Sequence, residues 1–245
     1  MKYFSPRSWL LLALVTLPLA RGVEKPSDRS LPAAAEHFLH ADSVDWKSVL
    51  PPPPEKGSIA ALADVETVLQ VQANRTAADV AWAKAIEKDD VYADYGEVLG
   101  VWFEPKNLPV TATFIRQVTG DVQMVNKKVK DLYPRTRPFA LEPTVKPAVG
   151  LPTSNSYPSG HSLRAYVWAA VLADVFPERQ VELYQQAHHI AWGRVQGGVH
   201  FPSDTIGARV TAQAVVTELR KSPAYRAAVE ACRAEVAPFL LKKAA

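Results

Sequence analysis

NSYPSGHS at residues 155–162 stands directly before an apolar run at residues 163–176, and together they predict a buried helix that begins with a polar turn. Ser159 is a favourable N-cap residue, and Gly160 has no side chain that would prevent a close approach. The first N–H groups of a helix have no partner within it and attract anions, above all phosphate. The stretch therefore predicts an anion-binding helix start that carries His161, although an ordinary turn with a partly exposed histidine has the same residues.

Helical periodicity outside this stretch predicts an all-α fold. Apolar residues recur with helical spacing in segments 59–86, 110–132, 162–176, 177–194, 203–220 and 224–240. The six prolines in residues 134–158 predict an irregular connection, which is long enough to be functional. Residues 92–103 are aromatic and apolar with two glycines, and they fit either a loose helix or a loop over a pocket. Because alternating β patterns are scarce, we expect one compact, single-domain helical bundle.

The N-terminal residues have the pattern of a secretory signal peptide. Lys2 and Arg7 precede an apolar run at residues 9–20, which is shorter than the roughly 20 residues that a membrane span needs. Small residues near the end of this run suit cleavage, and we place the signal peptide at residues 1–22. An uncleaved anchor is the alternative, but charged and proline-rich sequence follows at once. A cleaved signal peptide implies a periplasmic or secreted protein.

Residues 23–56 are expected to form an extended, proline-rich N-terminal strap that lies outside the core. They are rich in proline, alanine and charged residues, and the four consecutive prolines at 51–54 require an extended chain. The change to helical periodicity after this segment places the helical domain at residues 57–245.

Composition excludes several classes of protein. A chain of 245 residues with 48% hydrophobic residues can bury one sizeable core. The formal charge of +3 equals that of Lys2, Arg7 and Arg21 in the signal peptide, so the mature chain is near neutral and a nucleic acid polymer is not an expected partner. Cys232 is the single cysteine, which rules out an intrachain disulfide. No later segment reaches the length of a membrane span, so none is expected in the mature chain.

Three basic residues stand where predicted helices end. Lys130 ends one helix, Arg137 follows it in the proline-rich connection, and Arg194 ends another helix. Together with the N–H groups expected to be free at Ser159 and Gly160, these cations match the needs of a phosphoryl group. Arginine pairs bidentately with phosphate oxygens, and phosphoryl transfer depends mostly on positioning and on stabilising charge.

Two histidines could supply the nucleophile and the acid of such a reaction. His200 precedes Asp204 by four residues, and a carboxylate that accepts one ring N–H fixes the tautomer and supports the cation that forms. His161 has no neighbouring carboxylate in the sequence and is left as proton donor to the leaving oxygen. A metal site is the rival use of these residues, but three converging cations would oppose a divalent ion, and we expect no metal.

These residues resemble the signature of the type 2 phosphatidic acid phosphatase (PAP2) superfamily, which reads Lys-x6-Arg-Pro, Pro-Ser-Gly-His and Ser-Arg-x5-His-x3-Asp. Within that superfamily the chain looks like the secreted bacterial class A non-specific acid phosphatases. The resemblance also covers the four-proline segment with the Gly-Ser-Ile-Ala that follows it at residues 50–60, Arg-Pro-Phe-Ala at 137–140 and Ser-Pro-Ala-Tyr at 222–225. The membrane-embedded lipid phosphatases of the superfamily share the motifs but need several spans, which this chain lacks.

The resemblance implies a helical bundle of the acid phosphatase and haloperoxidase type, and a metal-independent hydrolase for small phosphomonoesters. His200 would form a phosphohistidine, Asp204 would orient His200, and His161 would protonate the leaving alcohol and then activate water. The resemblance implies no metal or organic cofactor. Homo-oligomers are known among these enzymes, so self-association stays open.

The chain departs from the family pattern in two places. Gly193 stands where the signature has serine, and we expect this to remove a hydrogen bond at the rim of the phosphate site. Segment 92–108 matches the family poorly, and because this part of the chain helps to cover the pocket in such enzymes, it leaves the substrate preference open.

Three functions remain open on the sequence. The first is a secreted acid phosphatase, with transfer of the phosphoryl group to alcohols or nucleosides as a variant. The second is a vanadate-dependent haloperoxidase, whose site uses the same residue types. The third is a secreted protein that binds a phosphate ligand without turnover, although binding alone would require neither His161 nor His200.

Overall fold

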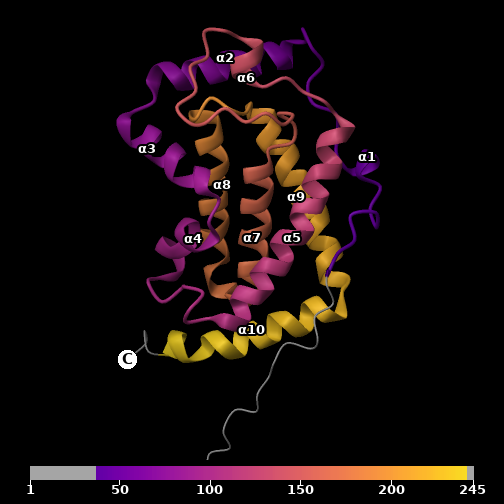
Figure 1. The fold of residues 1–245 in the computed structure, drawn as a ribbon, viewed down its shortest axis with the longest axis vertical. Coiled ribbons are helices and arrows are strands. Elements are labelled where there is room, and N and C mark those ends of the chain that lie inside the picture. Colours follow the sequence, from indigo (N-terminus) through magenta and orange to yellow (C-terminus); the bar gives the residue numbers. More distant parts are fainter. Residues whose placement is uncertain (1–36, 242–245) are drawn as a thin grey trace, which may run out of the picture.

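The computed structural model describes residues 37–241, so the predicted signal peptide at residues 1–22 lies outside the described range. The helices of the described range are α1 (Trp46–Val49), α2 (Ile59–Asn74), α3 (Ala77–Ala85), η1 (Ile86–Lys88), α4 (Val91–Leu99), α5 (Pro109–Leu132), α6 (Pro138–Leu141), α7 (Gly160–Val175), η2 (Pro177–Arg179), α8 (Gln180–Gln196), α9 (Pro202–Lys221) and α10 (Pro223–Leu241). No strand occurs among these residues, and the predicted all-α fold is confirmed (Figure 1).

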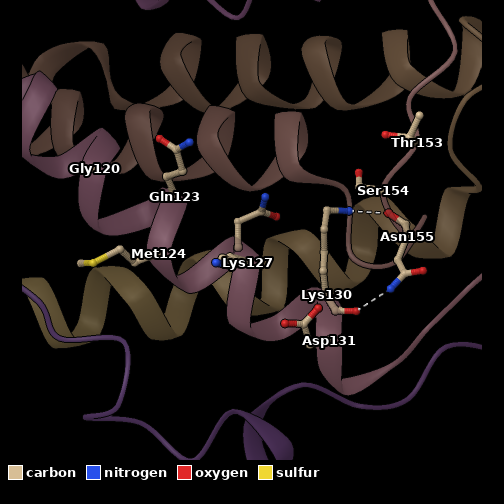
Figure 2. A pocket seen from close by; sticks show the side chains of 10 residues that line it. Gly120, Gln123, Met124, Lys127, Lys130, Asp131, Thr153, Ser154 and Asn155 are labelled. Atoms are coloured by element: carbon tan, nitrogen blue, oxygen red, sulfur yellow. Dashed lines mark hydrogen bonds between the residues drawn. The ribbon is translucent and has the colours of Figure 1, made fainter.

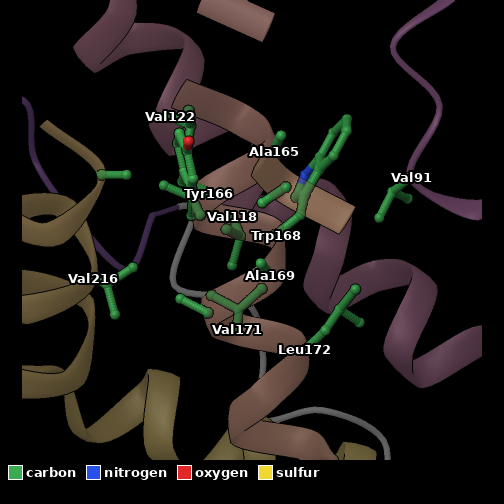
Figure 3. Packing of buried hydrophobic residues seen from close by; sticks show 14 of the residues in the cluster. Val91, Val118, Val122, Ala165, Tyr166, Trp168, Ala169, Val171, Leu172 and Val216 are labelled. Atoms are coloured by element: carbon green, nitrogen blue, oxygen red, sulfur yellow. The ribbon is translucent and has the colours of Figure 1, made fainter. Parts of the chain in front are cut away.

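Helix α7 is the centre of the bundle because it is apolar on nearly every side, and such a helix is stable only when it is surrounded. It packs chiefly against α8 and α9, and also against α5 and α10. Figure 3 shows the side chains of α7 among Val118 and Val122 of α5 and Val216 of α9. The one polar atom of Trp168 is satisfied, since its indole N–H donates to the Thr119 hydroxyl at 3.0 Å. Each large apolar side chain buried in this way contributes about 1.5–3 kcal/mol.

Helix α10 crosses the bundle at the end opposite to α2 and α6 (Figure 1). It is tied to α5 by Glu235, whose carboxylate accepts the N–H groups of Val110 and Thr111, each at 2.8 Å. The residue before α5, Leu108, has no side chain that could cap the helix, so α10 supplies the missing acceptor. This contact fixes the start of α5 and thereby the direction of the helix that ends at Lys130.

The expectation that the N-terminal strap stays outside the core is wrong for residues 37–56. Leu39, Trp46 and Leu50 are buried in the main hydrophobic core, and Trp46 begins the short helix α1. The buried carboxylate of Asp121 on α5 accepts the N–H groups of Phe38 and Leu39 at 2.9 and 3.1 Å. The segment therefore belongs to the folded domain, because its three apolar side chains and two N–H groups find partners there.

The structure defines the two segments whose conformation the sequence did not specify, residues 92–103 and 134–158. Residues 92–103 form most of helix α4 and a turn, and the helix ends at Gly100, whose φ of 111° is rarely adopted by residues with a side chain. The proline-rich connection at residues 134–158 contains only the four-residue helix α6 and lies at the α2 end of the bundle (Figure 1). Within residues 37–241, none of the helices combines the length and the apolar character needed to cross a membrane.

Candidate active site

The three segments that carry the predicted site residues, at 130–138, 155–162 and 194–204, meet where α5 and α8 end and α7 and α9 begin. The Lys130 ammonium donates to the carbonyl oxygens of Asn155 and Pro158 at 2.6 and 2.8 Å. Arg137 reaches the third segment, since its guanidinium donates to the carbonyl oxygen of Val199 at 2.8 Å. Lys130, Arg137 and Arg194 are all buried, and so is His200. The structure thus brings together residues that lie up to 74 positions apart along the sequence, between Lys130 and Asp204.

The geometry around His200 determines its tautomer. Its Nε2 lies 3.1 Å from Nη1 of Arg137, and a guanidinium can only donate, so Nε2 must carry the lone pair. Its Nδ1 lies 3.2 Å from Oδ2 of Asp204 and therefore holds the proton. Burial lowers the pKa of His200 to about 3, with the charges of Arg137 and Lys130 adding to the effect and Asp204 opposing it. His200 is therefore a neutral imidazole with an available Nε2.

Asp204 is a fully buried carboxylate with several donors. Its Oδ2 accepts the Phe201 N–H at 2.9 Å and the Ser156 hydroxyl at 2.5 Å, besides His200. Its Oδ1 accepts from the Arg135 guanidinium at 2.6 Å. Burial alone would raise the pKa of Asp204, but the hydrogen bond from His200, the charge of Arg135 and the Ser156 hydroxyl outweigh it and hold the pKa at about 2. Asp204 is therefore ionised at acid pH.

His161 lies in the first turn of α7, as predicted, and its Nε2 is 3.3 Å from the carbonyl oxygen of Glu87. Burial lowers the pKa of His161 to about 2, and the charges of Arg194 and Arg164 add to the effect. A histidine with so low a pKa is neutral, and it can act as an acid only if a nearby negative charge raises its pKa.

The cation cluster Lys130, Arg137 and Arg194 has the properties of an anion site. Burial lowers the pKa of Lys130 to about 7 and that of Arg137 to about 10, and each is lowered further by a neighbouring arginine. Burial also lowers the pKa of Arg194. Within residues 37–241, Nε and Nη1 of Arg194 are buried without a hydrogen-bond partner. Buried donors without acceptors and cations that repel one another are both stabilised by an anion.

The expectation of a free N–H at Ser159 is wrong. The Ser159 N–H donates to the backbone carbonyl of Asp204 at 3.0 Å, which joins the starts of α7 and α9. The Ser159 side chain caps α7 as predicted and accepts from the Ser162 N–H. The first N–H groups of the helix itself, at Gly160 and His161, remain the donors that an anion would meet.

Packing explains why a glycine, and not the serine of the signature, occupies position 193. A Cβ at this position would lie 2.5 Å from Cδ1 of Ile86 and 2.9 Å from Nε1 of Trp82. The Trp82 ring stacks on His189 of α8 with 4.1 Å between ring centroids, so it has little room to move. Trp82 and Ile86 thus occupy the space that a serine side chain would need.

Sequence reasoning missed two further arginines at this end of the bundle. Arg135 bridges the carboxylates of Asp204 and Asp64. Arg164 forms an ion pair with Asp89, and its charge acts on His161. Arg164 follows His161 by three residues and so lies on the same face of α7, which is a signal that the sequence contained. Arg135 gave no comparable signal, because an arginine in a proline-rich connection normally faces water.

A cavity of about 640 Å³ adjoins Lys130 (Figure 2). Its walls are Gly120, Gln123, Met124, Asn126, Lys127, Lys130 and Asp131 of α5 and the loop residues Thr153, Ser154 and Asn155. The cavity shares its Ser154 and Asn155 wall with the partners of Arg137, which donates to the carbonyl of Ser154 at 2.7 Å. It therefore offers room for a small polar group next to the cation cluster.

The described residues, 37–241, contain no group of three or more histidine, cysteine, aspartate or glutamate side chains placed to hold a metal ion. The carboxylates of Asp89 and Asp204 near the cation cluster are already in ion pairs with arginine or histidine.

The chain is similar in sequence to known phosphatases. Residues 110–227 match the PAP2 superfamily. The chain is 26% identical over 209 residues to the non-specific acid phosphatase of Providencia stuartii, which covers 82% of this chain and 84% of that protein. It is 29% identical over 205 residues to the non-specific acid phosphatase of Salmonella typhimurium, with 80% and 81% covered. Among solved structures, a transmembrane PAP2 type phosphatidylglycerolphosphate phosphatase from Bacillus subtilis is similar with a TM-score of 0.48 and 20% identity, over 67% of this chain and 87% of that one.

Proposed function

This chain belongs to the PAP2 superfamily through residues 110–227, and from that premise we propose that it is an acid phosphatase that hydrolyses phosphomonoesters through a phosphohistidine. The observation that carries the proposal is His200. It is buried and neutral, its Nδ1–H points to the carboxylate of Asp204, and its unprotonated Nε2 lies beside the cation cluster. The non-specific acid phosphatases to which the chain is similar support the same class of reaction.

In the first step, Lys130, Arg137 and Arg194 hold the phosphoryl oxygens, with the N–H of Gly160. Nε2 of His200 attacks phosphorus, the P–N bond forms as the ester P–O bond breaks, and the leaving oxygen takes a proton from His161. The phosphohistidine is a cation, and the Asp204 carboxylate that accepts its Nδ1–H stabilises it.

In the second step, His161 accepts a proton from water as the water oxygen attacks phosphorus. The P–N bond breaks, and His200 returns to the neutral tautomer. Binding of a phosphoryl anion beside His161 would raise the pKa of this histidine and so load it with the proton that the first step needs.

The cavity beside Lys130 offers room for a small leaving group. The signal-peptide pattern at residues 1–22 supports a periplasmic or secreted location. Transfer of the phosphoryl group to an alcohol instead of water would follow from the same intermediate.

The test is release of phosphate from an aryl phosphate in the presence of EDTA, with vanadate as inhibitor. We expect His200→Ala to abolish turnover, whereas His40→Ala, which removes an exposed histidine, retains it. A phosphohistidine also predicts that, with added glycerol, the ratio of phosphoglycerol to phosphate is the same for substrates with different leaving groups. Unchanged turnover in His200→Ala would overturn the proposal.

Two other outcomes would favour the alternative functions. Oxidation of halide by peroxide in the vanadate-loaded protein, without phosphatase turnover, would indicate a haloperoxidase. Tight binding of phosphate with no hydrolysis of nucleotides, sugar phosphates, a diphosphate or a lipid phosphate would indicate a binding protein.

A further inference from the structure

Arg135 makes a set of contacts that differs from that of Arg137, two residues later. Its Nη1 donates to Oδ1 of Asp204 at 2.6 Å and to the Ser203 hydroxyl at 2.7 Å, and its Nη2 donates to Oδ2 of Asp64 at 2.7 Å. The guanidinium carbon lies 4.2 Å from the centroid of the Phe201 ring. With two carboxylates, a hydroxyl and a ring face around it, the guanidinium has a single position.

Asp64 holds Arg135 from the side of α2. Its side chain is only 7% exposed, and its carboxylate also accepts the N–H of Ser203 at 3.1 Å and the Ser203 hydroxyl. Asp64 thus fixes Arg135 and the first turn of α9 together, and this is the turn that carries Asp204.

The two oxygens of Asp204 serve different partners. Oδ2 accepts from His200, Phe201 and Ser156, whereas Oδ1 accepts from Arg135. Within residues 37–241, Arg135 is the one arginine or lysine in ion-pair contact with Asp204. It approaches from the side away from His200, while Arg137 contacts His200 at Nε2.

We propose that Arg135, held by Asp64, is a positioning residue that keeps Asp204 ionised and aimed at Nδ1 of His200 at acid pH. The inference deepens the proposed function and rests on it. A buried carboxylate without its cation takes up a proton more readily, and a protonated Asp204 cannot stabilise the cationic phosphohistidine. An enzyme that works at acid pH needs this protection more than one that works at neutral pH.

The direction of the pH effect follows from the charges around the dyad of His200 and Asp204. Removal of the positive charge of Arg135 raises the proton affinity of both members, so the acid limb of the rate profile moves to higher pH. Removal of the negative charge of Asp64 acts in the opposite direction. The other charged or titratable groups that face the dyad stay in place in both variants; they are Lys130, Arg137, His161 and Tyr157.

The experiment compares pH profiles of kcat, and the inhibition constant of inorganic phosphate, for the full chain and four variants. Arg135→Met is expected to lower kcat at acid pH about 10- to 100-fold and to move the acid limb upward, with phosphate inhibition changed less than about twofold, because Arg135 does not touch the phosphoryl site. Arg135→Lys restores part of kcat, since it keeps the charge but loses the bidentate fork. Asp64→Asn moves the acid limb downward, because the asparagine oxygen can still accept from Arg135 while the negative charge of Asp64 is lost.

The matched control is Arg75→Met. Arg75 also ties the α2 side of the bundle to other elements, through the carbonyl oxygens of Gln196 at the end of α8 and Lys146 in the proline-rich connection, at 3.0 and 2.7 Å; it is not an ion-pair partner of Asp204. We expect it to lower the unfolding temperature without moving the acid limb. An acid limb that moves equally in Arg75→Met and Arg135→Met, that does not move in Arg135→Met, or that moves upward in Asp64→Asn would overturn the inference. So would a loss of phosphate affinity that parallels the loss of kcat.

A second readout does not depend on turnover. In ¹⁵N-histidine-labelled protein, His200 of the unmodified chain is expected to stay in the neutral Nδ1–H form to low pH, and in Arg135→Met its titration midpoint moves upward. If the unmodified chain has no phosphatase activity, the proposed function fails, and this measurement still decides the role of Arg135. An unchanged His200 titration in a folded Arg135→Met variant would overturn that role.

Discussion

The charges and the burial around His161 determine its protonation state. Arg194 and Arg164, together with burial, hold its pKa at about 2, so it is neutral until an anion enters the cation cluster. In the proposed mechanism, a bound phosphoryl group would raise the pKa of His161 and so make the imidazole a usable acid, which would couple binding to proton transfer.

If His161 protonates the leaving oxygen, His161→Ala should harm poor leaving groups most. We expect kcat for an alkyl phosphate to fall about 100- to 10,000-fold, and kcat for an aryl phosphate with an acidic phenol to fall much less in its first step. The measurement is kcat for a series of esters plotted against the pKa of the leaving alcohol, with a steeper slope in the variant. His40→Ala is the control, and equal losses for all esters would assign His161 to phosphate binding alone.

For single residues, motif spacing predicted which ones would lie close together but did not predict all of their hydrogen-bond and ion-pair partners. The predicted site residues lie together because each stands at or next to a helix end. They are Lys130, Arg137, His161, Arg194, His200 and Asp204. The free N–H expected at Ser159 was wrong, since a backbone contact to Asp204 across the bundle leaves no trace in sequence. Arg135 was missed for a related reason: Asp64, its partner, lies 71 residues earlier on another helix. The roles of these residues stay predictions until variants are measured.

Among the helices, the packing of α3 and η1 against α8 gives a second test. Trp82 and Ile86 fill the space beside Gly193, so Gly193→Ser would force an overpacked contact rather than restore a hydrogen bond to phosphate. We expect the variant to lose about 1–3 kcal/mol of unfolding free energy, with no gain in phosphate affinity. Urea unfolding and phosphate inhibition measure the two effects.

The control for this change is Gly96→Ser on α4, where a Cβ meets no atom within 4 Å. It should change stability by only a few tenths of a kcal/mol, because serine has a slightly better helix propensity than glycine. Tighter phosphate binding by Gly193→Ser would show that the serine of the signature still has a place to act in this chain.

Helix positions were predictable where apolar periodicity is strong and prolines mark the ends. The predicted helix at 110–132 is α5, which runs over Pro109–Leu132, and the predicted helix at 162–176 is α7, which begins two residues earlier and runs over Gly160–Val175. Residues 92–103 stayed ambiguous because two glycines weaken a short helix. The core role of Trp46 was missed because a single tryptophan among polar residues has no apolar period, so its burial depends on tertiary contacts.

For the molecule as a whole, buried titratable groups make opposite contributions to stability. His161 and His200 have folded pKa values below their usual value of 6.5, so their contribution is lost as pH falls below 6.5. Asp94 on α4 acts the other way. Burial, with the charges of Asp89 and Asp90, raises its pKa to about 7, so its contribution is present below its unfolded pKa and is lost as pH rises through about 7.

Asp94→Asn should therefore separate the contribution of Asp94 to the pH dependence of stability from that of the two histidines. The carboxyl of folded Asp94 is neutral at pH 4 and ionised at pH 8, whereas an asparagine is neutral throughout. We expect the variant to match the unmodified chain at pH 4 and to exceed its unfolding free energy at pH 8 by roughly 1–3 kcal/mol, less than the full shift would give because solvent screens the group. Urea unfolding of the full chain from pH 4 to 8 measures the difference. A constant difference for Asp94→Asn, or one that favours the variant only at low pH, would contradict this account. In that case the stability of the fold at acid pH would have to come from another group.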